Sequence, residues 1–347
     1  RWLRGAAVAV CGVLGLVVPA LFGTLAGVPD PVIQDEFSYL LAADTFAHGR
    51  LTNASPRYPE FFEAPHVLVV PTYSSKYPPG PGALLALGQV LTGRPIWGIW
   101  LGCGLFAASL CWMLQSWVSR RWALGITLVV IVTLGTSTYW AQSYWGGMVP
   151  AAGAALVFGG VRRQIRSWTV SASTLSGVGF VVLMSSRPFE GLLVAIGPGF
   201  LVLRRFLQTG GDPRRWSRGL LPLVTVLALG GAFTAFHNQS VTGDWRRMPY
   251  TLNMDQYFRR GMFIFSPVRT PGLSPRSRVS SYYESDAHPS PAIAPGLQYA
   301  ENLYLRSVGT LGAAFGIVAS PRRDAEAYRG VLLWLALAIG VVGARTI

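Results

Sequence analysis

Charged residues are scarce in this 347-residue sequence: Asp, Glu, Lys and Arg make up only 13% of it, about half of the share usual in soluble domains. Cysteine and histidine are also scarce, with three and four copies, and the histidines show no paired-ligand spacing such as HExxH. P-loop and dinucleotide-binding fingerprints are absent. These absences argue against a water-soluble protein and against a dedicated metal or nucleotide site.

Hydrophobic residues make up 51% of the sequence, and several stretches without any charge exceed the roughly 20 residues that cross a bilayer. We therefore predict an all-α polytopic membrane protein with about nine membrane-spanning helices. The first span follows two arginines, as a signal peptide does, but it is too long for a signal-peptide apolar region and many spans follow it. The expected spans are residues 5–27, 96–118, 122–140, 147–162, 168–186, 188–205, 217–236, 303–319 and 330–346.

The basic excess, a net charge of +14, is typical of nucleic-acid binding, of anionic-lipid binding or of oriented membrane helices. With the N-terminus in the cytoplasm, the inner loops and the N-terminus carry 15 of the 29 Lys and Arg residues and only three of the 15 Asp and Glu residues. This is the positive-inside pattern. We therefore expect a multi-pass protein with a cytoplasmic N-terminus, and no nucleic-acid partner. Residues 82–92 are too few to span and are predicted as a helix lying at the outer interface.

Three parts of the chain are expected from this topology. Residues 1–236 form a transmembrane module that includes a long outer loop, residues 28–95, and residues 237–302 form a second outer loop of irregular structure. Residues 303–347 contain C-terminal spans. Because the chain starts with Arg and stops inside an apolar run, we expect it to be part of a longer protein. Small-residue spacings such as Gly98 with Gly102, and Gly312 with Gly316, are typical of helix packing.

A surface helix is predicted over residues 32–48 of the first outer loop. Residues 30–31, Asp-Pro, are a favourable start, and Gly49 is a favourable stop. Asp35 and Glu36 would point about 100° apart on this helix, so one can face a cavity while the other contacts a neighbouring element. A carboxylate in such a cleft can act as a general base toward a hydroxyl. The alternative is a pair of solvated carboxylates that favour the helix dipole.

The same loop contains residues 73–81, Tyr-Ser-Ser-Lys-Tyr-Pro-Pro-Gly-Pro. The Pro and Gly residues predict a rigid turn that presents Lys76 just before the interfacial helix. The ammonium there suits a lipid phosphate. The alternative is an interfacial lysine that reaches the lipid headgroups.

Two short outer turns carry further candidates. Arg187 in the first suits a phosphate, or it forms an ion pair with Glu190 three residues later. The second turn contains Trp140, Tyr144 and Trp145. These aromatic residues are typical of a membrane-interface belt, with sugar stacking as the alternative.

The order of these features resembles the GT-C superfamily of integral membrane glycosyltransferases. The resemblance rests on a first span, the sequence Asp-Glu-Phe-Ser-Tyr at residues 35–39, the Lys-Tyr-Pro-Pro-Gly sequence at residues 76–80, an interfacial helix and alternating spans, over roughly residues 1–240. The sequence is most similar to the branch with protein O-mannosyltransferases, lipid A aminoarabinose transferases and rhizobial lipopolysaccharide-core transferases. The resemblance implies a bacterial inner-membrane enzyme with an extracytoplasmic active site.

By this resemblance, the enzyme transfers a sugar from a polyprenyl-phosphate donor to a hydroxyl of a glycolipid, polysaccharide or protein, with inversion. Asp35 would be the catalytic base with Glu36 orienting or pairing beside it, and Lys76 would hold the donor phosphate with Arg187 as a second cation. Further candidates for substrate contact are Tyr39, Tyr77, Tyr144 and Glu190. No cofactor is assigned. Several relatives carry a second acidic residue where this chain has residues 144–149, and its absence leaves a divalent metal without support.

Two other classes of protein fit parts of the pattern. A polytopic transporter or lipid-linked-sugar flippase also has Gly and Pro in its spans, but the sequence shows no inverted repeat and almost no ionisable residue at mid-membrane depth. The other is a non-catalytic scaffold. Loss of activity on Asp35→Asn with retained folding would argue against both.

Overall fold

The computed structural model describes residues 2–136, 138–208, 214, 216–258 and 279, and most of these residues are helical. Short strands occur only between α2 and α3 within this part of the chain. The helices are α1 (Trp2–Ala26), α2 (Gln34–Ala47), η1 (Pro59–Phe61), α3 (Pro79–Thr92), α4 (Ile96–Leu114), α5 (Arg120–Gly135), α6 (Met148–Arg166), α7 (Val170–Met184), α8 (Pro188–Gln208), η2 (Trp216–Leu220), α10 (Leu221–Thr242) and α11 (Pro249–Tyr257). The strands are β1 (Asn53–Ala54), β2 (Val67–Leu68) and β3 (Thr72–Ser75).

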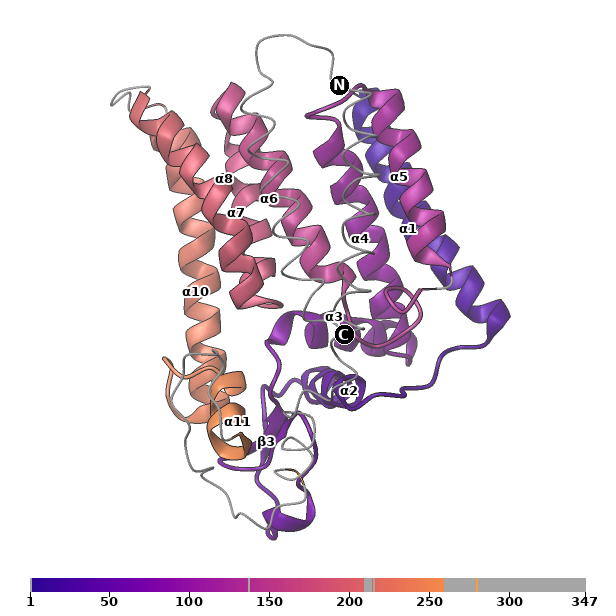
Figure 1. Cartoon of the computed structure of the whole chain (residues 1–347), viewed down its shortest axis with the longest axis vertical. Coiled ribbons are helices and arrows are strands. Elements are labelled where there is room, and N and C mark those ends of the chain that lie inside the picture. Colours follow the sequence, from indigo (N-terminus) through magenta and orange to yellow (C-terminus); the bar gives the residue numbers. More distant parts are fainter. Residues whose placement is uncertain (1, 137, 209–213, 215, 259–278, 280–347) are drawn as a thin grey trace, which may run out of the picture.

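The long helices α1, α4, α5, α6, α7, α8 and α10 lie alongside one another and run alternately up and down (Figure 1). Helix α4 packs against α1, α5 and α6, and α7 packs against α6, α8 and α10. Each expected span up to residue 236 coincides with one of these helices. The expected spans at 303–319 and 330–346 lie outside the described residues.

Three of the helices are long and apolar enough to cross a membrane: Gly5–Ala26, Ile96–Leu114 and Ser217–Thr242. Helices α5 and α7 have 16 and 15 residues, and α6 and α8 carry arginines in their last turns. The described part of the chain is therefore that of a helical membrane protein, and the full set of nine spans stays a prediction.

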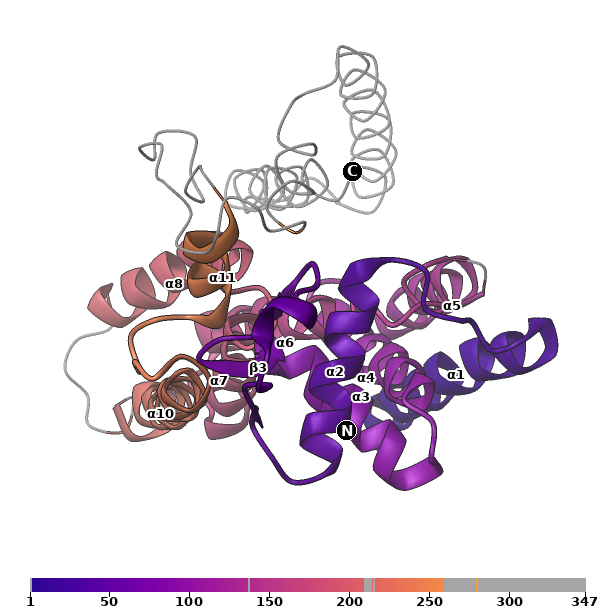
Figure 2. The same cartoon turned by 90° about the horizontal axis from the view of Figure 1, so that it is seen from below.

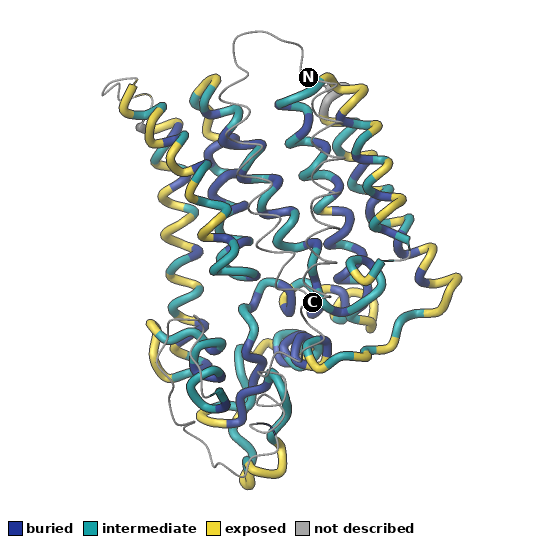
Figure 3. Tube along the Cα trace, viewed as in Figure 1, coloured by how far each residue is buried: buried dark blue, intermediate teal, exposed yellow. Residues whose placement is uncertain are grey.

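Large apolar side chains on the outside of the bundle support this assignment. Val13 on α1, Val132 on α5, Phe200 on α8 and Leu229 on α10 are all exposed, and exposed residues follow the outer faces of these helices in Figure 3. Such a surface is unfavourable in water and favourable in lipid.

Close packing at the start of α4 confirms that the spacing of Gly98 and Gly102 serves helix packing. A Cβ atom at Gly98 would overlap the backbone carbonyl of Leu84 in α3, and one at Gly102 would lie 3.0 Å from the Leu84 side chain. Helix α3 is therefore fixed tightly across α4. The second spacing, Gly312 with Gly316, lies outside the described residues.

Helices α2 and α3 lie across one end of the bundle and pack against each other (Figures 1 and 2). The expected start of α2 at residues 30–31 is wrong, because the helix begins at Gln34. The carboxylate of Glu36 takes the capping role by accepting the backbone N–H groups of Val32 and Ile33 at 2.8 and 3.1 Å. The stop is confirmed: Gly49 adopts φ +71°, a left-handed conformation that suits glycine. Helix α3 begins at Pro79, before the expected residue 82.

The strands form a small antiparallel sheet in the order β1-β3-β2, beside α2. Asn53 pairs with Tyr73, and Val67 pairs with Ser75. This sheet was not predicted, because strands of two to four residues carry no readable alternation. Its last strand ends directly before Lys76.

The second outer segment is described only in part. Helix α10 continues to Thr242, beyond the expected end at residue 236, and α11 follows from Pro249 to Tyr257. The buried side chain of Asn253 in α11 donates from its amide nitrogen to the carbonyl of Val67 at 3.2 Å, so α11 is joined to the sheet. The division of the chain into three parts stays a prediction.

Candidate active site

Asp35 lies in the first turn of α2, the helix that lies across one end of the bundle and packs against both α3 and β3. The hydroxyl of Tyr77 donates a hydrogen bond to Oδ1 of Asp35. The other oxygen, Oδ2, lies 3.5 Å from Nε2 of His66. The Asp35 side chain is 22% exposed, so it is not a fully solvated carboxylate.

His66 joins Asp35 to the Lys76 segment. Its backbone has φ +65°, and its carbonyl accepts the Ser38 hydroxyl at 2.7 Å and the Lys76 backbone N–H at 3.2 Å. Burial, followed by the positive charge of Lys76, lowers the pKa of His66 from its usual 6.5 to about 4, while the Asp35 carboxylate acts in the opposite direction. The imidazole is therefore neutral at neutral pH.

Lys76 is 4% exposed and lies beneath aromatic rings. Its Nζ atom is 5.3 Å from the ring centroid of Tyr77, 5.0 Å from that of Tyr250 and 5.9 Å from that of Phe258. Burial lowers the pKa of Lys76 from 10.5 to about 8, although the Asp35 carboxylate favours the charged form. The Lys76 side chain is therefore covered by these rings and is not exposed at the surface.

Two stacked tyrosines form one wall of the site. The rings of Tyr39 and Tyr77 lie 4.5 Å apart with an angle of 18° between their planes. Burial, followed by the Asp35 carboxylate, raises the pKa of Tyr77 well above its usual 10.0. Burial also raises the pKa of Tyr39, with the Arg187 charge acting against it. Both hydroxyls therefore stay protonated and can donate.

Glu36 has a different environment from Asp35. Its side chain is buried, with Oε2 accepting from the backbone at residues 32 and 33 and Oε1 accepting from the Tyr144 backbone N–H at 2.8 Å. The Tyr144 hydroxyl donates to the carbonyl of Pro29 at 3.1 Å. These bonds fix the α1–α2 connection to the segment before α6. The sequence pattern placed Glu36 and Tyr144 among the site residues. Their contacts give them a structural role next to Asp35, because they hold the connection that leads into α2.

Arg187 and Glu190 are in contact with each other at the start of α8, with Nη1 of Arg187 3.8 Å from Oε1 of Glu190. The arginine side chain is 34% exposed, so it is not enclosed in this contact. The turn is joined to α3 because the backbone N–H of Gly80 donates to the carbonyl of Ser185 at 2.7 Å. The charges of Arg187 and Glu190 both act on the pKa of Tyr39, so this ion pair lies near the two stacked tyrosines.

His66, Tyr250 and Phe258 were not among the residues singled out in the sequence. His66 is one of four scattered histidines, and nothing in its spacing distinguishes it. Tyr250 and Phe258 belong to the second outer segment and reach Lys76 only through the tertiary fold. The tyrosines, lysine and carboxylate that were singled out in residues 35–77 do come together.

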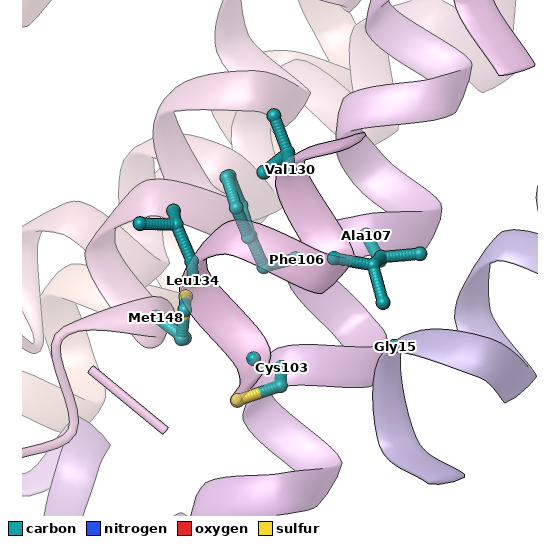
Figure 4. A pocket seen from close by; sticks show the side chains of 9 residues that line it. Gly15, Cys103, Phe106, Ala107, Val130, Leu134 and Met148 are labelled. Atoms are coloured by element: carbon teal, nitrogen blue, oxygen red, sulfur yellow. The ribbon is translucent and has the colours of Figure 1, made fainter. Parts of the chain in front are cut away.

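A small apolar cavity lies elsewhere, inside the bundle between α1, α4, α5 and the start of α6 (Figure 4). Its lining includes Phe106, Leu134 and Met148, and it offers no charged group for chemistry. Among the described residues, no cluster of three or more His, Cys, Asp or Glu side chains could hold a metal ion. The titratable groups that the structure brings together beside α2 are Asp35, His66, Lys76, Tyr39 and Tyr77.

Comparison with protein-family models, with curated proteins and with solved structures finds no match to this chain.

Proposed function

We propose that the protein is a GT-C-type membrane glycosyltransferase that moves a sugar from a polyprenyl-phosphate donor to an acceptor hydroxyl. The acceptor is a glycolipid, a polysaccharide or a protein. In this proposal the chain spans a bacterial inner membrane several times with a cytoplasmic N-terminus, and the end of the bundle with α2, α3 and the sheet faces the extracytoplasmic side.

One observation carries the proposal: the Asp35 carboxylate and the Lys76 ammonium, 41 positions apart in the chain, both lie against Tyr77. Tyr77 links them, since its hydroxyl donates to Asp35 and its ring lies 5.3 Å from the Lys76 ammonium. A displacement that inverts a sugar centre needs one base and a stabilised phosphate leaving group. A carboxylate and a cation that both contact Tyr77 would supply both.

The proposed reaction assigns one step to each of these groups. Asp35 takes the proton of the acceptor hydroxyl while the acceptor oxygen forms a bond to the anomeric carbon. The bond between that carbon and the phosphate oxygen breaks, and the electron pair leaves with the polyprenyl phosphate. Lys76 stabilises the negative charge on the phosphate, with the exposed part of Arg187 as a second cation.

The burial of Lys76 sets a condition on donor binding. The ammonium lies beneath Tyr250 and Phe258, so a phosphate reaches it only if one of these rings moves. Once there, the phosphate would be shielded from water, which strengthens its attraction to the cation. Tyr250 is in α11, so donor binding and the position of α11 would be coupled.

The test is transfer of radiolabelled sugar from a panel of polyprenyl-phosphate sugars to membrane extracts that contain the full chain. We expect wild type to transfer label from one donor, and Asp35→Asn and Lys76→Ala to lose transfer while accumulating equally in the membrane. Transfer by no donor, or an Asp35→Asn variant as active as wild type, would overturn the proposal. The transporter alternative would then be measured by uptake of lipid-linked sugars into vesicles.

A further inference from the structure

His66 has an unusual backbone for a residue with a side chain. Its φ of +65° lies in the left-handed region, and no other residue except glycine has a positive φ in the described part of the chain. A Cβ atom makes this conformation unfavourable, so it persists only where the surroundings hold it. Backbone conformations of this kind gather at functional sites.

The surroundings of His66 hold its backbone from two sides. Its carbonyl accepts the Ser38 hydroxyl of α2 at 2.7 Å and the backbone N–H of Lys76 at 3.2 Å. The buried hydroxyl of Ser38 is also within 2.8 Å of the Ser75 hydroxyl, which in turn accepts the Tyr77 backbone N–H at 3.1 Å. The position of His66 is therefore tied both to the helix with Asp35 and to the segment with Lys76.

The side chain of His66 faces the carboxylate of Asp35. Oδ1 of Asp35 accepts the Tyr77 hydroxyl, and Oδ2 lies 3.5 Å from Nε2 of the imidazole. An ionised carboxylate only accepts hydrogen bonds, so a hydrogen bond between these two atoms would use the tautomer with a proton on Nε2. The charged groups that act on the imidazole are Asp35 and Lys76. Tyr77 and His66 thus approach the two different oxygens of one carboxylate.

We propose that His66 is a positioning residue for the base: its imidazole orients Oδ2 of Asp35, and its carbonyl sets the backbone of Lys76 relative to that base. One residue then fixes the distance between the group that takes the proton and the cation that holds the phosphate. The inference rests on the proposed glycosyl transfer. Misplacing a base by about 1 Å costs roughly 100-fold in rate, so a positioning residue has a measurable effect on turnover.

The test separates the imidazole from the backbone. Glycine adopts the left-handed conformation freely, so His66→Gly removes the ring without straining the chain. Asparagine tolerates this conformation better than most residues and is too short to reach Oδ2, so His66→Asn is the second variant. His48, an exposed residue at the end of α2, provides the matched control His48→Ala.

With the donor found for wild type, we expect both His66 variants to lower kcat by about 10- to 100-fold with little change in the KM for the donor. Added imidazole should restore part of the kcat of His66→Gly, and none of that of Asp35→Asn. His48→Ala should match wild type. A folded His66→Gly with the kcat of wild type, or with a changed KM alone, or without any response to imidazole, would overturn the proposal.

A second measurement does not depend on activity. In protein with 15N-labelled histidine, we expect the His66 signals to report a proton on Nε2 and to change on Asp35→Asn. Signals that do not respond to Asp35→Asn would overturn the proposed contact. Absence of transfer by wild type with every donor would instead count against the glycosyltransferase function, while the NMR signals would still decide whether His66 orients Asp35.

Discussion

The carboxylates of Asp35 and Glu36 are adjacent in the chain and have no described hydrogen-bond partner in common. Asp35 accepts the hydroxyl of Tyr77, whereas Glu36 accepts backbone N–H groups, including that of Tyr144. The helix turns by about 100° between them, which directs one toward the sheet and the other toward the bundle. The two residues should therefore respond differently to the same chemical change.

Asp35→Asn should abolish sugar transfer with little loss of stability. The amide still accepts the Tyr77 hydroxyl but cannot take a proton from an acceptor, and a general base contributes about 100- to 10,000-fold in rate. The measurement is the initial rate of label transfer at matched protein levels. Asp44→Asn, an exposed carboxylate later on the same helix, is the control and should keep full activity.

Glu36→Gln should instead lower stability. The amide side chain has only one oxygen, so at least one of the backbone N–H groups held by Glu36 loses its acceptor, at a cost of about 1–3 kcal/mol. Thermal unfolding in detergent would show a lower midpoint than for Glu60→Gln, an exposed glutamate in the first outer loop. Equal midpoints for the two variants would show that Glu36 does not hold the α1–α2 connection.

The stability and the transfer activity of the protein should both depend on pH through the titration of Lys76. Its pKa in the folded protein is lowered to about 8, below the usual 10.5, so between these values the unfolded chain binds more protons than the folded chain. The contribution of Lys76 to stability therefore rises with pH over this range. Transfer activity should fall over the same range, because the phosphate loses its cation.

The pH profile of Lys76→Arg is the corresponding check. Arginine keeps its charge at all these pH values, so this variant should lack the decline in activity above about pH 8, even if its rate is lower throughout. An unchanged decline in Lys76→Arg would assign the titration to another group.

Gly80→Ala should move the turn that carries Arg187 relative to the segment that carries Lys76. A Cβ atom at this position would lie 2.7 Å from the Ser185 carbonyl oxygen, so the turn that carries Arg187 would have to move away from α3. We expect a loss of about 1–3 kcal/mol in stability and a higher KM for the donor. Gly125→Ala, where nothing lies within 4 Å of the new atom, should keep the donor KM of wild type and lose no stability, because alanine suits a helix interior better than glycine. A donor KM equal to that of wild type would contradict the proposed contribution of Arg187.

Local sequence signals predicted the main elements of the first outer loop well. The helix at residues 32–48 is observed as Gln34–Ala47, and its stop at Gly49 has the expected left-handed backbone. The start was misplaced because the cap comes from Glu36, inside the helix, and not from Asp30 before it. The small sheet was missed because its strands are held by pairing and not by their composition.

The sequence by itself determined that this is a helical membrane protein, since the free energy of placing a segment in lipid depends mainly on its own composition and length. It also singled out Asp35, Lys76 and Tyr77 as candidates. Only the tertiary structure decided which carboxylate meets Tyr77 and which accepts the backbone N–H of Tyr144, 108 residues away. It alone brought His66 to Asp35 and Tyr250 over Lys76. These contacts join distant segments, and their geometry depends on packing that no local pattern encodes.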